Sequence, residues 1–109
     1  MTTFDATIGP EVQQGVINFN ASGDNLVILG AINSRIKVLQ FFLVISAATN
    51  IIYKSGSTPI SGPLVFGSNG AHVLDYMQLP LTCNWGDSFI INSSNAVQVG
   101  GTVWYAVLI

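Results

Sequence analysis

Residues 35–56 read "RIKVLQFFLVISAATNIIYKSG", and this stretch decides the fold. From Val38 to Tyr53 it holds sixteen residues without a charge, most of them apolar. A transmembrane helix needs about 20 predominantly apolar residues. The run is shorter than that, and the polar cluster "SAATN" (46–50) interrupts it with a turn-prone sequence. We therefore expect no membrane span here.

A buried helix does not fit the stretch either. The apolar residues from Phe41 to Ile45 are consecutive and would surround a helix instead of forming one stripe. The enrichment in Val, Ile, Phe and Tyr favours strands, which we predict over 35–46 and 50–54 with a short turn between them. The apolar phase of the first strand changes near Leu39, which indicates a β-bulge or burial on both faces.

The remainder of the chain continues the β pattern, with turn signals every 6–12 residues. The loop 55–63 has two Ser-Gly pairs and two prolines, and Asn69-Gly70 is typical of a hairpin turn. Further strands are predicted over 15–21, 26–32, 64–66, 71–76, 78–83, 88–92 and 97–109. The last of these strands has no charged side chain, so it must be central in a sheet or covered by another chain.

These patterns predict an all-β protein: a two-sheet antiparallel sandwich, jelly-roll-like, with about eight strands. An immunoglobulin-like sandwich is the rival, but the chain lacks the Cys–Trp–Cys set of such domains. We expect residues 1–14 to form an N-terminal arm and residues 15–109 to form the sandwich domain.

Charge is scarce in this sequence of 109 residues: only 7% are Asp, Glu, Lys or Arg, against about 25% in an average soluble domain. A neutral Ser/Thr/Asn surface would explain this, and so would a surface covered by partners, because interface cores are depleted in charge. With three basic residues and a net charge of −2, we expect no binding to nucleic acid or to membranes.

The sequence contains no arrangement typical of an enzyme. Its one histidine, His72, has no acid in phase beside it, and we expect it to be an exposed strand residue or an interface contact. The single cysteine, Cys83, is expected to be a small buried hydrophobe. No clustered metal ligands, phosphate loop or nucleophile elbow occur, so we predict a non-enzymatic protein without cofactor or metal. The N-terminus lacks the features of a signal peptide, which predicts a chain made in the cytoplasm.

Several short motifs together resemble those of small virion proteins of tailed bacteriophages and prophages. The motifs are Ser46-Ala47-Ala48, Lys54-Ser55-Gly56, Ser61-Gly62-Pro63, Asn69-Gly70, Gly86-Asp87, Asn92, Val99-Gly100-Gly101 and Tyr105. Ala71 departs from the pattern, where a second glycine is common. The resemblance covers residues 25–108 and is to jelly-roll capsid decoration (cement) proteins, which sit as trimers on a capsid, or to small fibre modules.

The resemblance implies a structural virion protein on the capsid surface, assembled in the host cytoplasm. Its partners would be two further copies in a homotrimer and the major capsid protein. We predict that the subunit interface involves Phe41, Leu43, Trp104, Ala106 and Leu108. We predict that the arm contacts the capsid through Phe4, Ile8 and Val12.

The alternative is a receptor- or glycan-binding module of a phage tail or fibre. Exposed aromatic rings can stack on sugars, and Trp85 and Tyr53 are the candidates for that role. Packing in a core or an interface is the other interpretation of these rings.

Overall fold

The computed structural model describes residues 12–75 and 81–109, and it has strands and no helix among them. The stretch 35–56 forms β3 (Arg35–Ile45) and β4 (Thr49–Ser55), as predicted. The two strands lie in different sheets, and only residues 46–48 connect them. Residues 12–75 and 81–109 contain no helix that is long and apolar enough to cross a membrane.

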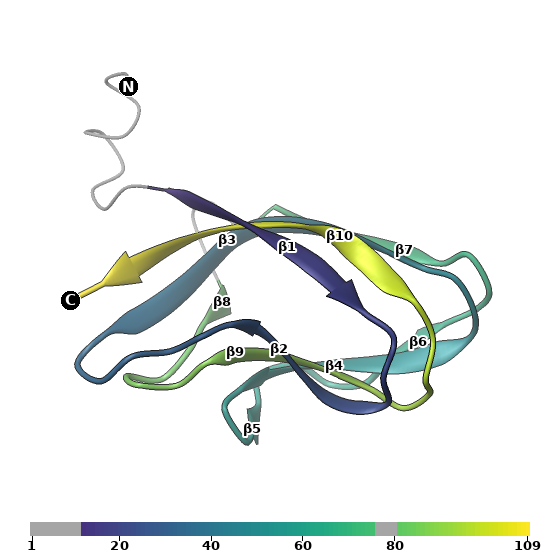
Figure 1. Ribbon diagram of the computed structural model, residues 1–109, viewed down its shortest axis with the longest axis horizontal. Coiled ribbons are helices and arrows are strands. Elements are labelled where there is room, and N and C mark those ends of the chain that lie inside the picture. Colours follow the sequence, from purple (N-terminus) through teal and green to yellow (C-terminus); the bar gives the residue numbers. More distant parts are fainter. Residues whose placement is uncertain (1–11, 76–80) are drawn as a thin grey trace.

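Two antiparallel sheets pack face to face, which confirms the predicted sandwich (Figure 1). The first sheet consists, in spatial order, of β1 (Gln13–Phe19), β10 (Val99–Leu108), β3 and β7 (Ala71–Asp75), and β8 (Leu81–Thr82) also pairs with β3. The second sheet consists of β2 (Gly23–Ile28), β9 (Phe89–Ser93), β4 and β5 (Thr58–Pro59), and β6 (Leu64–Phe66) also pairs with β4.

The order of these strands is that of a jelly roll. Without the two-residue strands β5 and β8, the orders are β1-β10-β3-β7 and β2-β9-β4-β6, and most connections cross from one sheet to the other. The described part of the chain has ten strands where about eight were expected, and β5 and β8 account for the difference. Strand β1 begins at Gln13, so the sandwich starts two residues before the predicted domain boundary at residue 15.

The long last strand is central, as its uncharged sequence required. β10 pairs with β1 on one side and with β3 on the other. The predicted alternation along β10 also holds: Val99 and Val103 are buried against the second sheet, and Trp104 lies on the opposite face. Its hydrogen-bonding groups are therefore used inside the sheet and are not offered to another chain.

A β-bulge lies at the phase change near Leu39. Trp104 pairs with Gln40 and Tyr105 pairs with Val38, so Leu39 is an extra residue on β3. Because of this extra residue, Val38 and Phe41 both point into the core although three positions separate them. The bulge keeps both halves of β3 buried on the same side of the sheet.

The core fills the space between the sheets. Its centre is an aromatic group in which the Phe41 and Tyr53 ring centroids lie 5.0 Å apart and those of Tyr53 and Phe89 lie 6.1 Å apart. The other buried members are Ile17, Ile28, Ile36, Val38, Leu43, Ile45, Ile51, Cys83, Ile91, Val99 and Val103. Both sheets contribute large side chains, so neither sheet could bury its apolar face without the other.

Candidate functional site

His72 points towards the sandwich interior and is not the exposed strand residue that was one expectation from the sequence; the other expectation, an interface contact, stays a prediction. It is partly buried on β7, opposite Leu43 of β3. The Tyr53 hydroxyl lies 2.7 Å from His72 Nδ1, and the Phe41 and Phe66 rings pack around the imidazole. Burial lowers the pKa of His72 below its ordinary value of 6.5. Burial also raises the pKa of the Tyr53 phenol, so both groups are neutral near pH 7.

This environment predicts acid sensitivity of the fold. Since folding lowers the pKa of His72, the unfolded chain takes up a proton first when the pH falls below about 6.5. The free energy of unfolding should therefore decrease from pH 6.5 down to the pKa of folded His72. Urea unfolding at pH 7.5 and 5.5 measures this. His72→Gln keeps a polar partner for Tyr53 and should lose most of the difference; an equal difference in both proteins would contradict the assignment.

Cys83 and Asp87 serve packing and loop geometry. Cys83 is fully buried, as expected, and burial is the main cause that raises the pKa of its thiol to about 11. The Asp87 carboxylate accepts a hydrogen bond of 2.8 Å from the Ser55 hydroxyl, which in turn accepts one of 2.8 Å from the backbone N–H of Asn84. Residues 12–75 and 81–109 contain no group of three His, Cys, Asp or Glu side chains that could hold a metal ion.

The Cys83 thiol should be unreactive in the folded protein. The thiolate is the nucleophile, and a buried thiol with a pKa of about 11 forms very little of it at pH 8. We expect labelling by iodoacetamide to be at least about a hundredfold slower in buffer than in 6 M guanidinium chloride. Mass spectrometry of timed samples measures this, and rapid labelling in buffer would show that the 83–88 region opens.

The outer face of the first sheet exposes several large apolar side chains. Phe42 is 42% exposed, Val44 51% and Val16 72%; Phe42 and Val44 lie on β3 and Val16 on β1, with β10 between the two strands. Phe42 and Val16 are both in register with Thr102 of β10. The half-buried Trp104 packs beside Phe42 with ring centroids 6.2 Å apart. We call Val16, Phe42, Val44 and Trp104 the sheet patch.

Two of the predicted interface residues do not reach this surface. Phe41 and Leu43 are fully buried in the core of a single chain, so their assignment to a subunit interface is wrong. The physical reason is the bulge at Leu39, which turns Phe41 and Leu43 inward and leaves Phe42 and Val44 outside. The sequence showed that alternate residues of β3 share a face. The prediction placed Phe41 and Leu43 on the outer face, where the structure has Phe42 and Val44.

The other three predicted interface residues lie on the outer face. Trp104 and Leu108 are partly exposed, and Ala106 is 6% exposed. Their place in an interface stays a prediction. Of the predicted capsid contacts, Phe4 and Ile8 lie outside the described residues. Val12 is partly buried and comes directly before β1.

The two aromatic candidates for sugar stacking have different environments. Tyr53 is 2% exposed, so its assignment as a stacking platform is wrong: its ring belongs to the core. Trp85 is 54% exposed in the loop after β8. The Arg35 guanidinium lies 5.7 Å from the Trp85 ring centroid, in the range of a cation–π contact, and holds the ring on one side.

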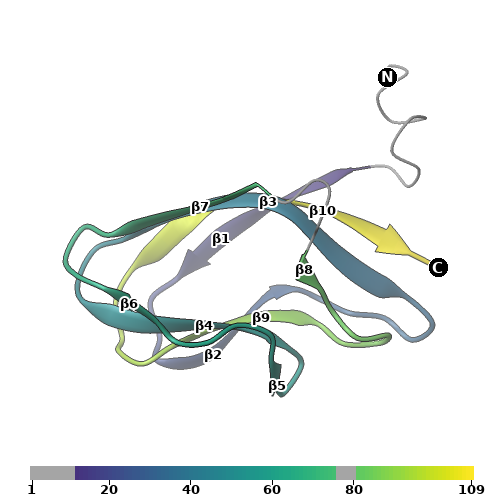
Figure 2. The same ribbon diagram turned by 180° about the vertical axis from the view of Figure 1, so that it is seen from behind.

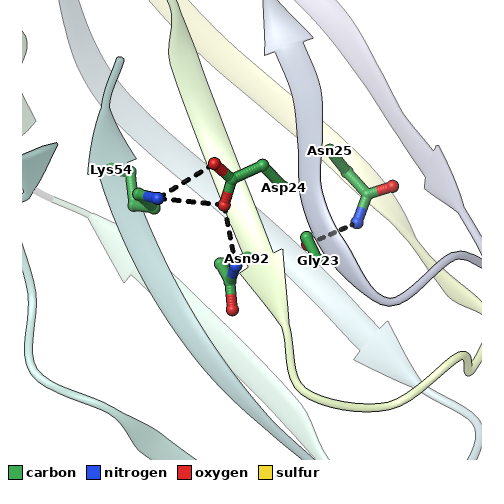
Figure 3. A network of polar contacts seen from close by, with 5 residues as sticks. All are labelled: Gly23, Asp24, Asn25, Lys54 and Asn92. Atoms are coloured by element: carbon green, nitrogen blue, oxygen red, sulfur yellow. Dashed lines mark hydrogen bonds and ion pairs between the residues drawn. The ribbon is translucent and has the colours of Figure 1, made fainter. Parts of the chain in front are cut away.

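The outer face of the second sheet has a polar network at its centre. Asp24 of β2 forms an ion pair of 2.9 Å with Lys54 of β4 and accepts a hydrogen bond of 2.7 Å from Asn92 of β9 (Figure 3). The Asn92 hydrogen bond, followed by Lys54, lowers the pKa of Asp24. Leu26 and Val65 are also exposed on this face. Because the Asp24–Lys54 pair lies on the same face, these two side chains do not form one continuous apolar area.

The fold thus places the protein in the class of antiparallel two-sheet sandwiches with jelly-roll strand order. No protein-family model, curated protein or solved structure matches the chain. The surfaces of the chain itself are therefore the observations that bear on its function.

Proposed function

We propose that this chain is a non-enzymatic structural virion protein that decorates a phage capsid as a homotrimer and stabilises it. The sheet patch is the observation that carries this proposal. It joins residues of three neighbouring strands, and none of its four side chains is charged; Lys37 lies on the same face, in register with Ala106, towards one end of the sheet. Copies of this patch can therefore meet around a symmetry axis without repulsion between like charges.

The composition supports the same proposal. A chain with 7% charged residues that also exposes Phe42, Val44 and Val16 is poorly suited to remain monomeric. Contact between copies would remove these side chains from water. The first sheet suits this contact better than the second, whose outer face has the Asp24–Lys54 pair at its centre. The motif resemblance to capsid decoration proteins agrees with a trimer attached to the major capsid protein.

Two measurements on the same protein test the proposal. Light scattering after size exclusion should give three times the mass of the chain, and the protein should sediment with capsids assembled without it. The variant Phe42→Ser with Val44→Ser should elute as a monomer and bind capsids much more weakly, because attachment through three linked copies is multivalent.

A matched control removes apolar surface from the other sheet. Val65 is 80% exposed on the second sheet, so Val65→Ser should leave the trimer mass and capsid binding unchanged. A monomeric wild-type protein that does not sediment with capsids would refute the proposed function. Loss of the trimer in Val65→Ser, but not in the Phe42 and Val44 variant, would place the subunit interface on the second sheet.

A receptor- or glycan-binding module remains the second candidate because of Trp85 alone. Its ring is exposed and held by Arg35, as a stacking platform requires. Glycan-array binding by the wild type that Trp85→Ala abolishes without loss of fold would favour this candidate.

A further inference from the structure

Exposed apolar side chains also gather at one end of the sandwich. Leu29 is 76% exposed and Ile32 is 87% exposed, and both lie in the connection between β2 and β3. Trp85, 54% exposed, lies in the connection between β8 and β9. Figures 1 and 2 show these two connections at the same end of the molecule. We call residues 29–34 and 83–88 the loop tip.

Hydrogen bonds hold the two loops of the tip together. The backbone N–H of Gly30 donates to the Ser88 hydroxyl at 2.8 Å, and that of Gly86 donates to the Ser34 carbonyl at 2.7 Å. At Gly30 the loops approach so closely that a Cβ atom would lie 2.7 Å from the backbone nitrogen of Ser88. The apolar side chains are thus presented by paired loops, which lowers the entropy lost on binding.

Positive charge borders the tip. Arg35 donates from Nε to the Cys83 carbonyl at 2.8 Å and stacks on Trp85. Arg35 and Lys37 form no ion pair with any residue that the structure describes. The one acid of the tip, Asp87, is partly buried and accepts a hydrogen bond from the Ser55 hydroxyl, so the two cations outnumber it. An acidic surface would therefore complement this border.

We propose that the loop tip is the surface that docks on the capsid shell, against a capsid-protein surface with an apolar recess bordered by carboxylates. This inference rests on the proposed function and assigns its partner contact. The sheet patch would join the copies, and the loop tip of each copy would face the shell.

A protein partner suits the tip better than a lipid surface. Asn33 and Asn84 are exposed beside Ile32 and Trp85, and hydrocarbon would leave these amides and the loop backbone without hydrogen-bond partners. Two cations give only weak attraction to anionic lipid. Trp and Arg, in contrast, are enriched among the residues that dominate protein interfaces.

The test compares two double variants on undecorated capsids. Leu29→Ser with Ile32→Ser removes the two most exposed large apolar side chains of the tip. Leu26→Ser with Val65→Ser removes two exposed aliphatic side chains, 59% and 80% exposed, from the second sheet. We expect the tip variant to bind capsids at least about tenfold more weakly and the control to bind like the wild type. Both should keep the wild-type oligomeric mass. Lys37→Glu should also weaken binding, most clearly at low salt.

The outcomes separate this inference from the proposed function. If the wild type binds capsids and the tip variant binds equally well, the tip is not the docking surface, although the proposed function stands. If the wild type does not bind, both fail. Vesicles of phosphatidylcholine with phosphatidylglycerol should not bind the wild type; binding that the tip variant loses would overturn the inference in favour of a lipid surface.

Discussion

Phe41→Ala is expected to lower the free energy of unfolding by about 3–5 kcal/mol, the range for removing a buried aromatic side chain. Phe41 is fully buried and contacts the rings of Tyr53 and His72 from opposite sheets. Alanine would leave a cavity at the centre of the sandwich that the surrounding strands cannot close. Against a total stability of about 5–15 kcal/mol, the loss should be plain in urea unfolding at pH 7.5.

The next residue on the same strand provides the control. Phe42 points outward and is 42% exposed, so Phe42→Ala should change the stability of the single chain by less than about 1 kcal/mol. If Phe42 lies in the proposed trimer interface, Phe42→Ala also weakens the trimer. That part of the stability loss should decrease as the protein is diluted and the trimer dissociates. The effect of Phe41→Ala should persist at every concentration. Equal, concentration-independent losses in both variants would show that the strand does not have the described orientation.

Gly101→Ala is expected to cost about 3 kcal/mol or more, because the added methyl group meets backbone atoms that cannot rotate away. A Cβ atom at Gly101 would overlap the Phe42 carbonyl oxygen and lie 2.9 Å from the Leu43 Cα. Only a shift of β3 against β10 could relieve this overlap, and both strands are central in the first sheet. Thermal and urea unfolding of the purified variant measure the loss.

Gly100→Ala is the matched substitution at the neighbouring position. The nearest atom to a Cβ there is the Ile17 carbonyl oxygen at 3.9 Å, which is an ordinary contact. Gly100 has no positive φ angle, so alanine should be tolerated and can raise stability by about 0.4–1 kcal/mol through the unfolded chain. Similar stabilities of the two variants would contradict the close approach of β10 to β3 at Gly101.

Much of the architecture followed from local patterns. The apolar run from Val38 to Tyr53 is too short and too interrupted for a membrane helix, and its consecutive β-branched and aromatic residues required strands. The alternation of β10 correctly separated Val103 from Trp104. Loop 55–63 was expected to lack regular structure, yet Thr58 and Pro59 form a two-residue strand that folds back on Ser55 and Lys54 across a tight turn with Gly56 at positive φ.

Local sequence patterns predicted the candidate surfaces less well than the strands. Alternation along β3 separates Phe41 from Phe42, but it does not say which of them faces the core. His72 was expected to be an exposed strand residue or an interface contact because no acid lies in phase beside it, and its placement beside Tyr53 depends on β7 lying across from β4. Trp85 was the exception: its position in a turn correctly indicated exposure.

The sequence by itself determined that this protein is built from strands, where most of them run, and which side chains share a face, because a strand places alternate side chains on opposite sides. The tertiary structure decided which face is inside, how the bulge at Leu39 turns Phe41 inward, and which loops meet at the tip. Those choices depend on contacts between segments far apart in the chain. No local period encodes them, because each is settled by which arrangement buries the most apolar surface at once.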